Sequence, residues 1–150
     1  MTTDEYIKAF TQTRINAYIE ATASYKVGQT VYAEMDGMPV KAKVTGIKAP
    51  MLYEDYCICY GDEVPFGLES SIYDSFERLR TIVATGLKRR AEDWRKMEQS
   101  EFEWLFEEGS GPLSSYTFDD IRVSIIADLE ARVLFWQMAT EDDVIDLDKQ

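Results

Sequence analysis

Between Arg78 and Lys96 the sequence concentrates basic side chains that could hold an anion. This basic island (residues 78–96) contains only two acidic residues, although the whole chain carries a net charge of −12. Its basic members are Arg78, Arg80, Lys88, Arg89, Arg90, Arg95 and Lys96. Arginine offers a planar fork of donors that suits a phosphate. We therefore take Arg78, Arg80, Lys88, Arg89 and Arg90 as candidate ligand-binding residues for a nucleotide-like anion.

The same basic residues have a structural alternative. They can pair with Glu92, with Glu98, with the acidic C-terminal end or with a neighbouring subunit, as charged runs on solvated faces often do. Duplex nucleic acid is disfavoured as a ligand, because the rest of the acidic surface would repel its phosphate backbone.

Acidic side chains form the second candidate surface, near the end of the same predicted helix. It comprises Glu101, Glu103, Trp104, Glu107 and Glu108. Such a surface could present carboxylates where a nucleic-acid-binding or defence protein expects phosphates, or it could simply keep the chain soluble. These five residues are the candidate partner-binding site.

Catalytic chemistry is strongly restricted by composition. The chain has no histidine, which excludes Ser–His–Asp and Cys–His triads and HExxH zinc sites. Adjacent carboxylates such as Asp119-Asp120 diverge on a helix, whereas carboxylate catalysis needs convergence in a cleft. Cys57 and Cys59 are two residues apart in a predicted strand. A disulfide between them would be strained, and a metal site would need more ligands than these two thiols. We predict no catalytic residue, no metal and no cofactor.

The elements that must position these residues begin with a helix over residues 1–25. Thr2 and Glu5 have the spacing of a capping box. An apolar stripe follows at helical spacing: Ile7, Phe10, Ala17, Tyr18 and Ala21. Lys26-Val27-Gly28 ends this helix.

Residues 28–70 alternate in polarity as strands do. Asp36-Gly37 and Gly61-Asp62 mark hairpin turns, and 64–68 form a short strand interrupted by Pro65. Four or so short strands in this β module favour a small antiparallel sheet or barrel. In strand pattern the module resembles the SH3-like modules of many unrelated proteins.

Residues 71–140 are predicted to form a long antiparallel helical hairpin. The first helix runs from about Ser71 to Glu108, and the second begins at Thr117. The buried stripe of the second helix is Ile121, Ile125, Leu129, Val133 and Trp136. The two helices hold more aromatic residues than one face can bury, which predicts a homo-oligomer. The acidic tail, 141–150, is expected to fray.

The chain is thus expected to be a single α+β domain over 1–150. No apolar run is long enough to span a bilayer, and the first residues do not resemble a signal peptide, so we expect a cytoplasmic protein. Its size, acidity and lack of motifs resemble the accessory proteins of phages and mobile elements, including those that block host defences. This resemblance implies a non-catalytic inhibitor that occludes a partner protein. Sequestration of a nucleotide-like anion is the alternative, and a carboxylate-dependent enzyme is a lesser one.

Overall fold

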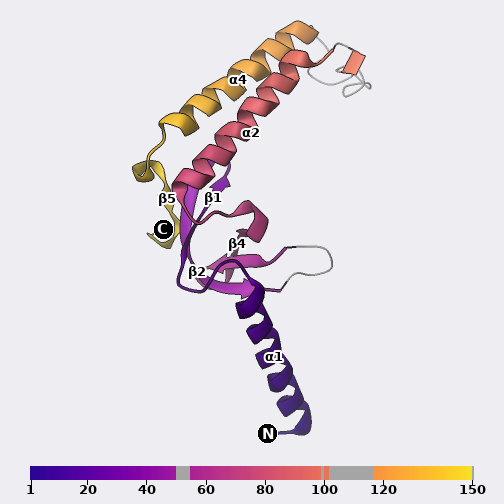
Figure 1. Cartoon of the computed structure of the whole chain (residues 1–150), viewed down its shortest axis with the longest axis vertical. Helices are drawn as coiled ribbons and strands as arrows, with labels where there is room; N and C mark the ends of the chain where they lie inside the picture. Colours follow the sequence, from indigo (N-terminus) through magenta and orange to yellow (C-terminus); the bar gives the residue numbers. More distant parts are fainter. Residues whose placement is uncertain (50–54, 99, 102–116, 150) are drawn as a thin grey trace. The chain divides into compact units, whose positions relative to one another are not determined.

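The computed structural model describes residues 1–49, 55–98, 100–101 and 117–149, and its architecture is α+β (Figure 1). An N-terminal helix precedes a curled antiparallel sheet of four strands, and two further helices follow. The chain divides into two compact units, residues 1–79 with 143–150 and residues 80–142. Among the described residues, no helix is long and apolar enough to cross a membrane.

Helix α1 spans Thr3–Thr22, within the predicted 1–25. It begins at the predicted capping box: the Glu5 amide donates to the Thr2 hydroxyl at 3.1 Å, and the Thr2 amide donates to the Glu5 carboxylate at 2.8 Å. Asp4 and Glu5 also place negative charge at the positive end of the helix dipole. Local sequence therefore explains where this helix starts.

The sheet of the first unit has the order β1-β2-β3-β4. Its strands are β1 (Thr30–Met35), β2 (Met38–Lys48), β3 (Cys57–Tyr60) and β4 (Val64–Leu68). The predicted turn between β1 and β2 is confirmed, with Asp36 at φ 52° and Gly37 at φ 83°. Both values lie in the left-handed region that Gly and Asp tolerate best. The turn at Gly61 (φ 55°) likewise joins β3 to β4.

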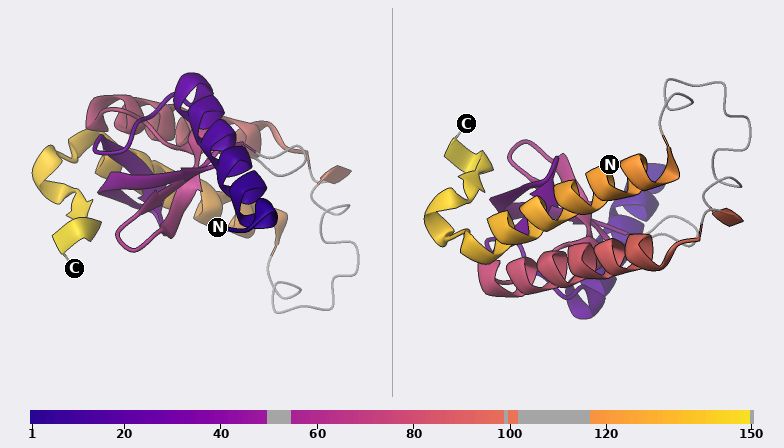
Figure 2. Two further views of the ribbon diagram at one scale, coloured as in Figure 1. Left: turned by 90° about the horizontal axis from the view of Figure 1, so that it is seen from below. Right: turned by 90° about the horizontal axis from the view of Figure 1, so that it is seen from above.

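The core of this unit follows from period-two burial along the strands. Its buried members are Val31, Ala33, Val40, Ala42, Val44, Ile58, Phe66 and Ile72. The backbone of Tyr32 on β1 also pairs with that of Tyr73, through two N–H···O bonds of 2.8 and 2.9 Å. The left view of Figure 2 shows the curl of the strands.

The C-terminal segment departs from the prediction of a frayed tail. It forms a 3₁₀ turn at Glu141–Asp143, strand β5 at Ile145–Asp146 and a second 3₁₀ turn at Leu147–Lys149. Strand β5 pairs in parallel with Val40 and Lys41 of β2. The reason lies in the sheet: β3 pairs with β2 only from Val44 onward, so the earlier part of β2 has an edge that β5 can occupy.

The second unit is built on α2 (Phe76–Lys96), whose first turn belongs to the first unit, and α4 (Phe118–Met138). Helix α2 is shorter than the predicted 71–108: residues 69–71 form a 3₁₀ turn, and Met97 and Glu98 are not helical. A 3₁₀-type bond from the Met97 amide to the Trp94 carbonyl tightens the last turn.

Helix α4 begins as predicted, with Thr117 as N-cap and Asp120 completing its capping box. Its buried residues are Ile121, Leu129, Val133 and Trp136, while Ile125 of the predicted stripe is half-buried. Among the described residues, a hydrogen bond and an ion pair join α2 to α4 and its C-cap. The Arg80 guanidinium donates to the Ala139 carbonyl at 3.3 Å, and Arg95 forms an ion pair with Glu130.

Candidate functional site

The N-terminal helix exposes the apolar stripe that the sequence contains. Tyr6, Ile7, Phe10 and Tyr18 are each more than half exposed, and Ile19 is the one buried residue of α1. Ile19 comes nine residues after Phe10, which is about two and a half helical turns, so the two side chains leave opposite sides of the helix. The stripe therefore points away from the sheet. We call Tyr6, Ile7, Phe10, Ala17 and Tyr18 the α1 face.

The aromatic residues of the α1 face are organised among themselves. The rings of Tyr6 and Phe10 lie 6.4 Å apart and are inclined by 13°. The Arg14 guanidinium lies 5.0 Å from the centre of the Phe10 ring, in cation–π range. Tyrosine and arginine are the residue types that carry much of the binding energy in protein interfaces. The α1 face thus has the composition of a helix that lies in a partner's groove.

The end of α1 nearest the sheet is anchored by polar contacts. The Thr22 hydroxyl is hydrogen-bonded to the Tyr56 hydroxyl, and the Ser24 amide donates to the Glu69 carboxylate at 2.8 Å. These bonds, together with buried Ile19, tie the last turns of the helix to the β module. They leave Tyr6 and Phe10 in the first half of the helix accessible.

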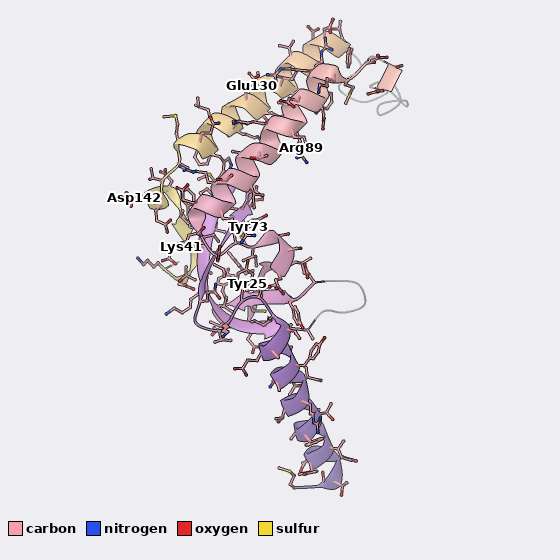
Figure 3. All side chains as sticks on the ribbon, viewed as in Figure 1. Tyr25, Lys41, Tyr73, Arg89, Glu130 and Asp142 are labelled. Atoms are coloured by element: carbon pink, nitrogen blue, oxygen red, sulfur yellow. The ribbon has the colours of Figure 1, made fainter. Side chains whose placement is uncertain are left out.

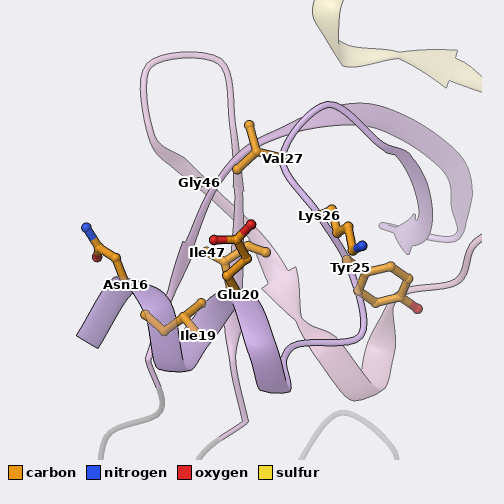
Figure 4. A pocket seen from close by; sticks show the side chains of 8 residues that line it. All are labelled: Asn16, Ile19, Glu20, Tyr25, Lys26, Val27, Gly46 and Ile47. Carbon is orange, nitrogen blue, oxygen red and sulfur yellow. The ribbon is translucent and has the colours of Figure 1, made fainter. Parts of the chain in front are cut away.

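A pocket of about 530 Å³ lies where α1 meets the sheet (Figure 4). Ile19 and Ile47 supply apolar surface, whereas Asn16, Glu20 and Lys26 supply polar groups of mixed charge. Its volume is within the range of small-molecule sites. With one cation beside one carboxylate, it lacks the convergent positive charge that a phosphate requires.

Arg78, the first residue of the basic island, lies in an acidic setting. It lines a second pocket of about 540 Å³ with Asp55, Glu69 and Asp74, and it lies 4.0 Å from the Asp74 carboxylate. Burial raises the pKa of Tyr25 in this pocket, and the charges of Asp74 and Glu69 raise it further, with Arg78 opposing them. Three carboxylates around one arginine would repel an anion.

The other candidate anion-binding residues are not brought together at one place. Arg80 is half-buried and donates to a backbone carbonyl. Lys88, Arg89 and Arg90 are exposed on α2, where Figure 3 labels Arg89. No ion pair joins these three to another described residue, but successive residues on a helix point about 100° apart. Within the described ranges, the residues of the basic island lie in separate environments and do not form one anion-binding site.

The candidate acidic surface is only partly described. Glu101 is exposed, and its amide donates to the Glu98 carbonyl at 3.0 Å. Glu103, Trp104, Glu107 and Glu108 lie outside the described residues.

The cysteines are both free thiols. Cys59 is fully buried, and burial raises its pKa, with a further contribution from neighbouring Cys57. A thiol with a raised pKa is a poor nucleophile. In the described parts of the chain, no three His, Cys, Asp or Glu residues are grouped so that they could hold a metal ion.

Comparison with known proteins finds no matching family model, no matching curated protein and no matching solved structure. Four residues of the α1 face belong to the predicted apolar stripe, whereas Tyr6 does not, and none of the five was predicted to bind a partner. The sequence did contain an indication of this site. Three large aromatic residues, Tyr6, Phe10 and Tyr18, lie with Arg14 on one helix that has its own N-terminal cap.

Proposed function

We propose that this chain is a non-catalytic, acidic binding protein of the cytoplasm that occludes a surface of a partner protein, and that the α1 face makes the contact. The observation that carries the proposal is the exposure of Tyr6, Ile7, Phe10 and Tyr18 on one side of a single helix. Contiguous exposed apolar surface on a small protein commonly marks an interaction site. An inhibitor of the phage or mobile-element type fits this arrangement.

The chemistry of the partner follows from charge. Residues 1–79 and 143–150 carry 15 acidic and eight basic side chains. A partner with an apolar groove and a basic rim would meet both the aromatic residues and the surrounding negative field. Nucleic-acid-binding proteins have such basic rims.

Two finer features of the architecture belong to this proposal. The four-stranded meander, the 3₁₀ turn at Glu69–Ser71 and the return to β1 at Tyr73 support an SH3-like barrel as the scaffold of α1. The contacts Arg80–Ala139 and Arg95–Glu130 support an antiparallel hairpin of α2 and α4, because the numbering rises along one helix as it falls along the other.

The test compares two serine variants of α1 that alter opposite sides of the helix. Phe10→Ser with Tyr18→Ser removes two aromatic side chains from the α1 face. Gln12→Ser changes the opposite side of the helix and serves as the control. Immobilised wild-type protein is used to capture the partner from host extract, and the purified partner is then titrated by calorimetry.

We expect the Gln12→Ser variant to bind as the wild type does and the double variant to bind about 1,000-fold more weakly, since each of the two interface hot spots contributes about 2 kcal/mol. Circular dichroism must show equal helix content. If the double variant binds the partner as tightly as the control, the α1 face is not the interface. If the wild type captures nothing, the occlusion proposal fails.

A second candidate function is supported by one observation. Lys88, Arg89 and Arg90 are exposed and make no ion pair with another described residue. They remain available to an anionic ligand. Titration with ATP should then release heat that disappears in an Arg89→Glu, Arg90→Glu variant. No heat with the wild type would remove this alternative and leave the occlusion proposal untouched.

A further inference from the structure

The side of α1 opposite the α1 face borders open space. Its residues at the sheet recur at intervals of three, one, three and one, which keeps them on one face of the helix. They are Gln12, Ile15, Asn16, Ile19 and Glu20. We call these five residues the inner face. Ile19 is buried, whereas Ile15, about one turn away, is 40% exposed. The inner face therefore still presents apolar surface.

Two pockets along the inner face form one groove between α1 and β2. The larger has a volume of about 530 Å³ and the smaller about 290 Å³. Four residues line both pockets: Asn16, Ile19, Gly46 and Ile47. From Gln12 to Glu20 the helix rises by about 12 Å. About two or three residues of extended chain, at about 3.4 Å each, fit within that length. The groove thus has the size of a short peptide.

Polar groups of opposite charge line the larger pocket and are available to a ligand. Glu20 and Lys26 are exposed and make no ion pair with another described residue. The side-chain oxygen of Asn16 accepts a hydrogen bond from the Gln12 amide at 2.8 Å, which leaves the N–H donors of Asn16 for a ligand. Figure 4 shows the Glu20 carboxylate between Asn16 and Lys26. The pocket thus offers one negative group, one positive group and amide donors.

We propose that this groove binds a short peptide that has free ends and apolar side chains. This inference goes beyond the proposed function and does not depend on the α1 face. Lys26 pairs with the carboxylate of the peptide and Glu20 with its ammonium group. Ile19 and Ile47 contact its side chains, and the Asn16 amide donates to a peptide carbonyl. An anion alone would bring its charge against Glu20, and an amine alone would bring its charge against Lys26, whereas a zwitterion satisfies both.

The first experiment varies the ligand on the full chain. Leucyl-leucine is titrated at millimolar concentration, and binding is followed by the NMR shifts of the backbone amides, which should move along the inner face and around Ile47. N-acetyl-leucyl-leucine lacks the ammonium group and leucyl-leucinamide lacks the carboxylate, so each should bind about tenfold more weakly. Glycyl-glycine keeps both charges without apolar side chains and should also bind about tenfold more weakly. A wild type that does not bind leucyl-leucine, or that binds all four ligands equally, overturns the proposal.

A second experiment tests which side chain meets which end of the peptide. Glu20→Gln should weaken leucyl-leucine about tenfold and leave N-acetyl-leucyl-leucine unchanged, because the acetylated peptide has no ammonium group to lose. Lys26→Gln should weaken leucyl-leucine in the same way and leave leucyl-leucinamide unchanged. Lys8→Gln removes an exposed cation from α1 outside the groove, and this matched control should bind as the wild type does. If Glu20→Gln weakens the free and acetylated peptides equally, or Lys8→Gln acts as Lys26→Gln does, the proposed site is wrong.

Discussion

Replacement of Trp136 by alanine tests the packing of the second unit most directly. Trp136 is 2% exposed and is among the largest fully buried side chains of the described residues. An aromatic side chain of this kind buries about 200 Å², which at about 25 cal/mol per Å² corresponds to about 5 kcal/mol. Alanine retains part of that contact, while a cavity adds to the cost. Measured Trp→Ala changes of about 3–5 kcal/mol agree with this balance.

The matched control is the neighbouring residue. Phe135 packs edge-on against Trp136, with ring centres 5.9 Å apart, but it is 36% exposed. Phe135→Ala should therefore cost about half as much or less, since less apolar area leaves the core. The assay is urea unfolding followed by circular dichroism, with the free energy of unfolding extrapolated to water. A loss below about 1 kcal/mol for Trp136→Ala, or a larger loss for Phe135→Ala, would show that α4 faces the other way.

Two further predictions concern the first unit. Leu147→Ala should destabilise it by about 1–2 kcal/mol, because Leu147 is a partly buried contact of the β core; a urea midpoint equal to that of the wild type would mean that the C-terminal segment does not dock. Iodoacetamide at pH 8 should label Cys57 long before Cys59, because burial raises the Cys59 pKa and shields its sulfur. Mass spectrometry showing equal labelling of the two thiols in the folded protein would contradict this burial.

Local patterns account for much of the fold. The alternation around Val31 and Val40 predicts which strand faces are buried, and Asp36-Gly37 predicts the turn between them because few residues tolerate a positive φ. The starts of α1 and α4 follow from Thr2 and Thr117, whose hydroxyls satisfy amides that a helix leaves unpaired. These features depend on residues within a few positions of one another.

The sites were less predictable, because they depend on partners distant in sequence. The seven basic residues form one cluster along the chain, yet Arg78 lies among carboxylates, Arg80 on a carbonyl and Arg95 against Glu130. Spacing along a helix determines the direction of each side chain, but the groups it meets come from other segments. The predicted acidic surface stays a prediction, since four of its five residues lie outside the described ranges.

By itself, the sequence determined the α+β class, the strand alternation and the helix caps, since each depends on hydrogen bonds and side-chain periods local to the chain. It also determined that α1 carries an apolar stripe. Only the tertiary structure decided that this stripe faces solvent, because Ile19 and Thr22 anchor the helix by its other side and its last turn. Likewise, only the staggered pairing of β2 with β3 left the edge on which the acidic C-terminal segment becomes a strand.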